Sequence, residues 1–285
     1  MKKKLLLFGG NGFIGRHIQK ETSKRNDWDM ICIDKEEMDL SEFGSEQRIR
    51  QIVSVDCPDA IVVLAATKRQ IKDGPEIKNL NNAISSNIAK GLKEFKGQIV
   101  YFSSCAVYGE KNEQCRITEK SKPIPTSDYG YHKIYSEEIY KAYCSKESRL
   151  LIIRPPLIYS CDELSGYSPG GFLNSALRDK EIVLWGDGRE IRELIHVEDV
   201  ACITMRLIGA EASGTINLVS GASYSYREIA EYIKKKLDIK IKCRARTGEK
   251  VNHTYNSRVL REVLAEYEFR TPFDAIDSKL NSILK

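Results

Sequence analysis

Short apolar runs alternate with polar, helix-compatible segments through the first half of the chain. The apolar runs occupy residues 5–8, 29–34, 59–66, 98–104 and 149–156, and the polar segments between them include 45–55, 76–95 and 129–145. Strands that are apolar throughout are typical of a parallel sheet with helices on both faces. The pattern therefore predicts an α/β fold built on a doubly wound parallel sheet.

The pattern changes after two consecutive prolines at 155 and 156. Beyond them we predict helices over 172–178 and 226–237, strands over 181–185, 214–220 and 239–243, a strand end running into an apolar helix over 194–208, and helical segments to the end. This part is interpreted as a smaller α/β lobe interleaved with the first domain. Residues 1–156 form the larger domain, to which about 190–212 return, and residues 157–189 and 213–285 form the smaller lobe.

Composition excludes several classes of protein. The 285 residues are 41% hydrophobic and 30% charged, with a formal net charge of +5. Lys and Arg are scattered without interleaved aromatic residues, so we expect no nucleic-acid partner. No stretch approaches the roughly 20 apolar residues of a membrane helix, and we expect no membrane association. The eight cysteines form no CxxC or Cys/His cluster, which indicates reduced thiols in a cytoplasmic protein and no metal site.

The stretch LLLFGGNGFIGRHI places three glycines, Gly9, Gly12 and Gly15, between an apolar run and a helix-compatible segment. In a strand–turn–helix, one glycine permits a sharp turn, a second lets the backbone approach a pyrophosphate, and a third lets the helix pack against the strand. The helix N-terminus then offers N–H groups and a partial positive charge to the phosphates. A glycine-rich loop without a ligand is the alternative, so the assignment depends on further residues.

An acidic residue, Asp34, closes the second apolar run, roughly 20 residues beyond the glycine turn. A carboxylate at this place accepts hydrogen bonds from the adenosine ribose hydroxyls and repels a 2′-phosphate. Asp34 therefore favours NAD over NADP, although Lys35 beside it weakens the discrimination.

The segment YGYHK places Tyr129 and Lys133 four residues apart at the start of a predicted helix, so both lie on one face. A free phenol has a pKa of about 10, and a nearby ammonium group and a cationic nicotinamide lower it by favouring the phenolate. Tyr129 is therefore a candidate acid–base group for a carbonyl/hydroxyl couple while hydride moves to or from a dinucleotide. Lys133 can also hold the nicotinamide ribose. Tyr-x-x-x-Lys is common by chance and needs a third partner.

The fourth apolar run leads into FSSCAVYG, residues 102–109. A hydroxyl at the end of this strand can hydrogen-bond the reacting substrate oxygen and orient it toward Tyr129. Ser104 is the preferred candidate and Ser103 the alternative. Cys105 is interpreted as a small residue that lines the pocket.

Together, GGNGFIG, FSSCAVYG, YGYHK and GDGREIRELIHVEDVA resemble the extended short-chain dehydrogenase/reductases of the NAD-dependent epimerase/dehydratase family, which act on nucleotide sugars. The resemblance extends to about residue 205. It implies a Rossmann domain with a C-terminal nucleotide-sugar domain, NAD as cofactor with NADP as the alternative, and Ser104, Tyr129 and Lys133 as catalytic residues. A homodimer, commonly formed through a four-helix bundle, would use the helices of 76–95 and 129–145.

The same resemblance assigns binding residues. The expected cofactor contacts are Gly9, Gly12, Phe13, Ile14, Gly15, Asp34, Asp39, Leu40, Ala65, Ala66, Lys133 and Pro155. Arg192 matches the arginine that holds the substrate diphosphate, a role suited to a guanidinium fork. Tyr159, Phe172 and Trp185 are candidates for lining the base or sugar pocket, and each is equally compatible with an ordinary core position.

Two departures from the family pattern bear on the reaction. Ser104-Cys105-Ala106 stands where members that dehydrate the sugar usually carry Thr-Asp-Glu, so the acid/base pair for a 4,6-dehydratase is absent. Leu157 stands where an asparagine often contacts the substrate, and Ser160 replaces a usual glycine.

Two reactions at C4 of the sugar therefore remain open. We favour a 4-ketoreductase of surface-polysaccharide sugar biosynthesis, which transfers hydride once to the ketone of an NDP-4-keto-6-deoxyhexose. A 4-epimerase of the UDP-glucose or UDP-GlcNAc type would instead remove and return hydride with a retained NAD. Asp34 favours the epimerase, whereas Leu157 and the short second lobe favour the reductase. A non-catalytic, NAD-sensing regulator is a remote third possibility, because such proteins commonly lack the Tyr/Lys pair.

Overall fold

The chain forms two compact units that are interleaved along the sequence. The computed structural model describes residues 2–67, 74–110, 113–162 and 168–283. Unit 1 comprises Met1–Glu110, Ser121–Arg154 and Ala201–Asn217, and unit 2 comprises Lys111–Lys120, Pro155–Val200 and Leu218–Lys285. We predicted a return to the larger domain over about 190–212. The segment that returns is 201–217, because Ile191–His196 pairs with strands of unit 2.

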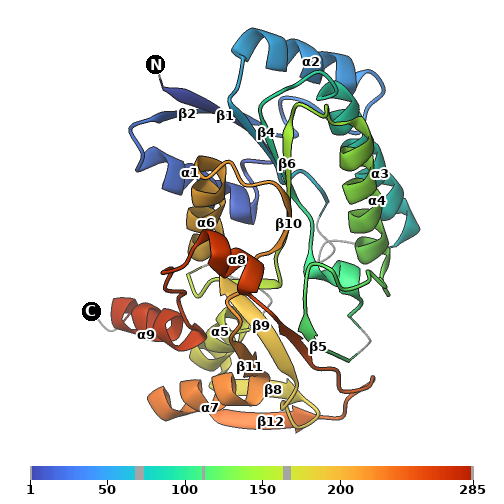
Figure 1. The fold of residues 1–285 in the computed structure, drawn as a ribbon. Coiled ribbons are helices and arrows are strands. Elements are labelled where there is room, and N and C mark those ends of the chain that lie inside the picture. The colour runs from blue at the N-terminus through green and yellow to red at the C-terminus, as the bar shows by residue number, and fades with distance from the viewer. Residues whose placement is uncertain (1, 68–73, 111–112, 163–167, 284–285) are drawn as a thin grey trace. The chain divides into compact units, whose positions relative to one another are not determined.

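Unit 1 is built on one six-stranded parallel sheet, which confirms the predicted fold class (Figure 1). Its strands, in spatial order, are β10 (Gly214–Asn217), β6 (Arg149–Arg154), β4 (Gln98–Phe102), β3 (Ala60–Val63), β1 (Lys3–Phe8) and β2 (Trp28–Ile33). The chain adds β2 on one side of β1 and all later strands on the other. The order therefore reverses between β1 and β3, and ligands of such sheets bind outside the carboxyl ends of the strands at that point.

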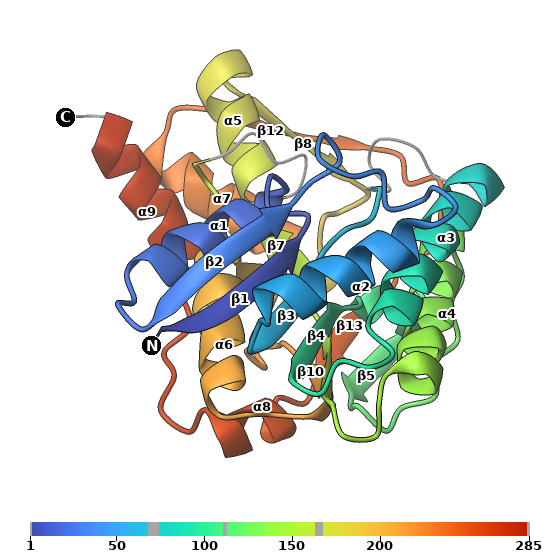
Figure 2. The ribbon, with the colours of Figure 1, turned by 90° about the horizontal axis from the view of Figure 1, so that it is seen from above.

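Helices cover both faces of this sheet (Figure 2). The helices on one face are α2 (Ser45–Asp56), α3 (Pro75–Gly91) and α4 (Asp128–Tyr143), and those on the other are α1 (Phe13–Ser23) and the C-terminal part of α6 (Val197–Gly209). Residues Leu5 to Phe8 of β1 are fully buried, as expected of a central strand. On the second face, the Thr22 hydroxyl of α1 donates to the Met205 sulfur of α6 over 3.6 Å.

Unit 2 combines three small sheets with helices. The strand groups are β11 (Ser223–Ser225), β9 (Ile191–His196) and β7 (Leu157–Tyr159); β12 (Lys240–Arg244) and β8 (Glu181–Trp185); and β13 (His253–Tyr255) and β5 (Gln114–Ile117). The helices are α5 (Gly170–Asp179), α7 (Tyr226–Lys236), α8 (Arg258–Val263) and α9 (Pro272–Ile283). The segment after 243 was predicted to be helical, and β13 corrects that prediction: its three residues are held by pairing with β5, far away in sequence.

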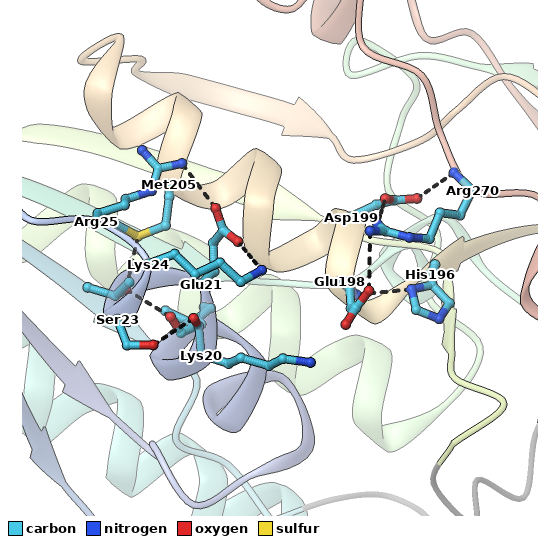
Figure 3. A network of polar contacts seen from close by, with 12 residues as sticks. Lys20, Glu21, Ser23, Lys24, Arg25, His196, Glu198, Asp199, Met205 and Arg270 are labelled. Carbon is cyan, nitrogen blue, oxygen red and sulfur yellow. Dashed lines mark hydrogen bonds and ion pairs between the residues drawn. The ribbon is translucent and has the colours of Figure 1, made fainter. Parts of the chain in front are cut away.

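A buried carboxylate fastens the C-terminal part of unit 2 to the start of α6. Asp199 is fully buried and accepts hydrogen bonds from the backbone N–H (2.8 Å) and guanidinium (2.5 Å) of Arg270 (Figure 3). It also accepts a 2.9 Å hydrogen bond from the Tyr267 hydroxyl. Glu198 pairs with the same guanidinium at 3.2 Å. Buried charges require such compensation, so the sequence motif HVEDV has a structural role in this unit.

Candidate active site

The glycine turn joins β1 to α1 at the switch point of the unit 1 sheet. Gly9 has φ of +90°, and a Cβ added there would lie 3.0 Å from the Ala65 nitrogen after β3. A Cβ on Gly15 would lie 2.3 Å from the Gly10 oxygen and 2.4 Å from the Gly9 oxygen. The turn therefore needs glycine at position 9 for its backbone conformation and at position 15 for the close packing of α1 against the loop.

The N-terminus of α1 has the character of a phosphate site. Gly12 is its N-cap, and among the described residues no side chain caps this end and no acidic residue lies in the first turn. The buried Asp34 at the end of β2 accepts a 2.9 Å hydrogen bond from the Asn11 N–H, which ties the turn to β2. An uncapped helix end, a glycine cradle and an adjacent carboxylate fit the pyrophosphate and adenosine ribose of a dinucleotide.

The other expected cofactor contacts differ in their surroundings. Ala65 and Ala66 follow β3 and are partly exposed. The Asp39 carboxylate accepts hydrogen bonds from the Ser41 hydroxyl (2.5 Å) and N–H (2.9 Å), which lower the pKa of Asp39. Leu40 packs in the unit 1 core and is only 7% exposed, so little of it is available to an adenine. Pro155 begins unit 2.

The two serines at the end of β4 have different surroundings. Ser103 is buried, and its hydroxyl donates a 2.5 Å hydrogen bond to Glu137. Ser104 is partly exposed and caps the short 3₁₀ helix η1 (Cys105–Tyr108), where its hydroxyl accepts from the Ala106 N–H at 3.1 Å. The Ser104 hydroxyl still has its proton to donate. These surroundings support Ser104, and not Ser103, as the residue that contacts substrate.

Tyr129 and Lys133 lie one turn apart on α4, as the spacing predicts. The Lys133 Nζ is 5.6 Å from the centroid of the partly exposed Tyr129 ring. Between them, Gly130 packs so closely on η1 that an added Cβ would lie 2.8 Å from the Ala106 oxygen. This contact brings the start of α4 against the turn that carries Ser104. Ser104, Tyr129 and Lys133 thus gather at the carboxyl ends of β4 and β6.

Lys133 is buried, and its ammonium group donates to the Phe102 carbonyl (2.8 Å) and the Tyr101 hydroxyl (3.4 Å). Burial lowers the pKa of Lys133 to about 8, and the carboxylate of Glu137 partly opposes that shift. The lysine side chain is therefore mostly charged at neutral pH, and its pKa lies only slightly above that pH.

Sequence analysis missed a buried ion pair behind this site. Glu137 lies one turn beyond Lys133 on α4, and Arg154 is the last residue of β6. The two form a bidentate ion pair at 2.8 and 2.5 Å. A Lys-x-x-x-Glu spacing on the same face of a helix is the signal that was available.

The residues predicted to contact substrate, apart from Ser104, lie in unit 2. Arg192 on β9 pairs with Glu190 and donates to the Val251 carbonyl. Glu190 also accepts from Arg246 at 2.5 Å, so one carboxylate holds two guanidinium groups. Sequence analysis missed Arg246; nothing in its local pattern RARTGE distinguished it from the surrounding basic residues.

The three predicted pocket aromatics differ in exposure. Trp185 is 55% exposed at the end of β8. Phe172 on α5 is half-buried against the Tyr226 ring. Tyr159 is completely buried, and its hydroxyl donates to the Arg270 carbonyl at 3.2 Å. Tyr159 is therefore a core residue of unit 2, and we withdraw its predicted contact with substrate.

Unit 1 thus has the features of a dinucleotide-dependent enzyme: a glycine turn at the switch point of a parallel sheet, a serine just after β4, and a tyrosine and a lysine on the adjoining helix α4. A comparison with family models matches residues 5–220 to the NAD dependent epimerase/dehydratase family. The chain belongs to this family of NAD(P)-dependent enzymes, which act on nucleotide sugars.

Curated relatives include proteins that act on different sugars. The chain is 25% identical to a GDP-6-deoxy-D-talose 4-dehydrogenase of Aggregatibacter actinomycetemcomitans, over 81% of this chain and 79% of that protein. It is also 25% identical to a putative UDP-glucose 4-epimerase of Methanocaldococcus jannaschii, over 81% of each. Among solved structures, MoeE5 in complex with UDP-glucose and NAD has a TM-score of 0.82 at 20% identity, over 98% of this chain and 99% of that one.

In the described part of the chain, no helix combines the length and the apolar character needed to cross a bilayer. The described residues also contain no group of three or more His, Cys, Asp or Glu side chains arranged to hold a metal ion.

Proposed function

We propose that the chain reduces the C4 ketone of an NDP-4-keto-6-deoxyhexose. Ser104, Tyr129 and Lys133 provide for proton transfer to one oxygen, while Cys105 and Ala106 beside them carry no carboxyl group for elimination. The observation that carries the choice of a reductase is Leu157. Leu157 has an apolar, half-buried side chain at a position where members of the family often have an asparagine that contacts the substrate. The similarity to a 4-dehydrogenase of a 6-deoxy sugar supports the same choice.

The residues of unit 1 divide the work at the ketone. NAD(P)H, when bound, supplies the hydride that reduces C4. Ser104 donates a hydrogen bond to the ketone oxygen and orients it, and Tyr129 donates the proton that this oxygen gains. The Lys133 ammonium stabilises the phenolate that Tyr129 leaves behind. Asp34, with a carboxylate at the end of β2, favours NAD and disfavours a 2′-phosphate.

Arg192 and Arg246 are proposed to hold the diphosphate of the nucleotide sugar. Both guanidinium groups converge on Glu190, which holds them side by side. Two positive charges against one carboxylate leave a net positive charge at this place, which suits the diphosphate. Trp185 and Phe172 of the same unit remain candidates for contacting the base or sugar.

A 4-epimerase with a retained NAD is the second candidate, and Asp34 is the observation that favours it. The Asp34 carboxylate accepts a hydrogen bond from the Asn11 N–H of the glycine turn, and we propose that it also binds the adenosine ribose, which suits a cofactor that stays bound. The third candidate function is that of a non-catalytic protein that senses NAD. The variant Tyr129→Phe distinguishes it, because this change would abolish turnover in an enzyme and leave partner binding intact in a sensor.

The first experiment identifies what the purified protein carries. The protein is isolated without added cofactor and denatured, and any released nucleotide is identified by chromatography and mass spectrometry. We expect little NAD, reversible binding of NADH or NADPH, and turnover of NDP-4-keto-6-deoxyhexoses. Near-stoichiometric NAD together with UDP-sugar interconversion would establish the epimerase instead. Failure to bind any dinucleotide would contradict both reactions.

We further propose a homodimer formed through α3 and α4. Tyr131 and Tyr135 lie four residues apart on α4 and are 56% and 40% exposed, and the Tyr135 hydroxyl lies 3.0 Å from that of Ser86 on α3. Such exposed aromatics on one helix face suit burial against a second copy. Light scattering should give the dimer mass for the wild type and the monomer mass for Tyr131→Glu/Tyr135→Glu; a monomeric wild type would contradict this proposal.

A further inference from the structure

Each side-chain nitrogen and carboxylate oxygen of the buried ion pair behind the site has a hydrogen-bond partner. Glu137 and Arg154 are 2% and 4% exposed. The carboxylate accepts two bonds from Arg154, at 2.8 and 2.5 Å, and a third from the Ser103 hydroxyl at 2.5 Å. The remaining Arg154 nitrogen donates to the Tyr108 hydroxyl at 2.8 Å, which in turn donates to Asn217 at 2.8 Å.

A buried ion pair is weak evidence for a contribution to stability. The cost of removing two charges from water can exceed their mutual attraction, and apolar replacements are often neutral or stabilising. The position of the pair in the fold is therefore more informative than its strength.

This pair joins the three segments that carry or adjoin the candidate catalytic residues. Two successive turns of α4 bind two successive residues at the end of β4. Lys133 donates to the Phe102 carbonyl at 2.8 Å, and Glu137 accepts from the Ser103 hydroxyl. Ser104 directly follows these two residues in the sequence. On the other side, Arg154 ends β6, and its carbonyl accepts a 3.2 Å bond from the Cys105 thiol. Glu137 therefore fixes the position of α4 relative to the backbone on both sides of Ser104.

Glu137 also provides the negative charge nearest in sequence to Lys133 on the same helix face. The other titratable or charged groups around Lys133 are Tyr129 and His132 on α4, Tyr101 on β4, and Arg154 behind Glu137. The pKa of His132 is lowered to about 2 by burial and by Lys133, so this imidazole is neutral and offers no compensating charge. Tyr101 is buried, which raises its pKa and keeps it neutral as well.

We propose that Glu137 is a positioning residue of the active site: held by Arg154 and Ser103, it sets α4 against the end of β4 and keeps the Lys133 ammonium charged for the reaction. The inference rests on the proposed roles of Tyr129 and Lys133. It adds that the charged state of Lys133 is set by a residue that touches neither substrate nor cofactor.

Glu137→Gln tests this role because it keeps the shape of the side chain and removes its charge. Burial and the uncompensated Arg154 cation then both oppose a charged Lys133. We expect the alkaline limb of the kcat profile to move by about one pH unit or more toward acid, and kcat at pH 7.5 to fall at least about threefold as the charged fraction of Lys133 decreases. Glu137→Asp, which keeps the charge, should restore the position of that limb even if kcat stays low. Glu147→Gln removes an equal charge from an exposed surface pair and should leave the profile unchanged.

A second readout needs no substrate. NMR of protein labelled at the lysine side chains, with the Lys133 signal identified by Lys133→Met, follows the titration of Lys133 directly. We expect its midpoint at lower pH in Glu137→Gln than in the wild type. If Glu137→Gln fails to fold, Glu137→Gln/Arg154→Met removes the pair without leaving a buried charge, and the midpoint should still shift in the same direction by a smaller amount.

The outcomes separate this inference from the proposed function. An unchanged Lys133 midpoint and an unchanged pH profile in a folded Glu137→Gln would overturn the positioning role, even with Tyr129→Phe inactive. Conversely, a shifted midpoint in a protein without any hydride-transfer activity would retain the electrostatic role of Glu137 and reject the proposed reaction.

Discussion

Replacing Gly15 by alanine is the sharpest test of how the glycine turn is built. An added Cβ would lie 2.3 Å from the Gly10 oxygen, 2.4 Å from the Gly9 oxygen and 2.7 Å from the Gly10 carbonyl carbon. Non-bonded contacts of carbon with oxygen are not found at these distances in folded proteins. Because all three atoms belong to the backbone, no side-chain rotation relieves the clash. Either α1 or the turn must move by several tenths of an ångström.

The size of the effect follows from the cost of overpacking. Forcing one extra methyl group into a packed site costs about 1–3 kcal/mol. For a domain of 150–250 residues, each kcal/mol lowers Tm by about 2–4 °C, so we expect a decrease of about 2–12 °C. The same movement displaces the backbone N–H groups that are placed for the pyrophosphate. If this displacement costs about 1.4 kcal/mol of binding free energy, the Kd for the dinucleotide rises tenfold in Gly15→Ala.

Thermal unfolding with and without NADH, together with calorimetric titration of NADH, measures both quantities. Gly209→Ala is the matched control: this glycine ends α6, and an added Cβ would meet nothing within 4 Å. It should leave the Kd unchanged and raise stability by about 0.4–1 kcal/mol. If Gly15→Ala keeps the wild-type Tm and Kd, the close packing of α1 on the turn is not what shapes this site.

Three further predictions concern other parts of the molecule. Ser104→Ala should lower kcat by about 100–1,000-fold with little change in Tm. Ser103→Ala should instead lower the free energy of unfolding by about 1–3 kcal/mol, because it removes a buried hydrogen bond to a carboxylate. Steady-state kinetics and urea denaturation of both variants distinguish the two serines. Burial raises the pKa of Glu193 from 4.5 to about 7, so the folded state prefers the protonated form, and the stability present below pH 4.5 is lost as the pH rises through 7. Glu193→Gln should therefore be more stable than the wild type at pH 8 by up to about 3 kcal/mol, and it should show no such advantage at pH 4.5. Arg246→Ala should raise KM for the nucleotide sugar at least tenfold while kcat changes less, and an equal effect in the exposed Arg178→Ala would contradict a specific role.

The elements of unit 1 were predictable because each carries its own signal. A parallel strand covered on both faces is an unbroken apolar run. The predicted run 5–8 lies within β1, and the predicted run 98–104 contains all of β4 and extends two residues beyond it. The glycine turn and the Tyr/Lys pair are also local patterns, since their members lie within seven residues of one another. Sequence alone therefore predicts where this chemistry lies on the sheet.

What sequence could not predict depends on partners distant along the chain. The strands β5 and β13 have four and three residues and are defined by pairing with each other, Gln114 with His253. Such short segments show no usable periodicity. Glu190 and Arg246 are 56 residues apart, and their ion pair appears only in the folded chain. The burial of Tyr159 likewise follows from the packing of several elements, so an aromatic residue after a strand was ambiguous between core and pocket.

The interleaving of the two units has a consequence for how the protein is made. The outer strand β10 of the large sheet ends at Asn217, after the chain has left unit 1 at Arg154 and passed through Pro155–Val200. A nascent chain on the ribosome therefore cannot close this sheet until most of its length has been synthesised. Until then the β6 edge lies unpaired, and exposed edges of this kind recruit other strands. We therefore expect fragments truncated before residue 217 to expose the β6 edge and to aggregate more readily than the full chain.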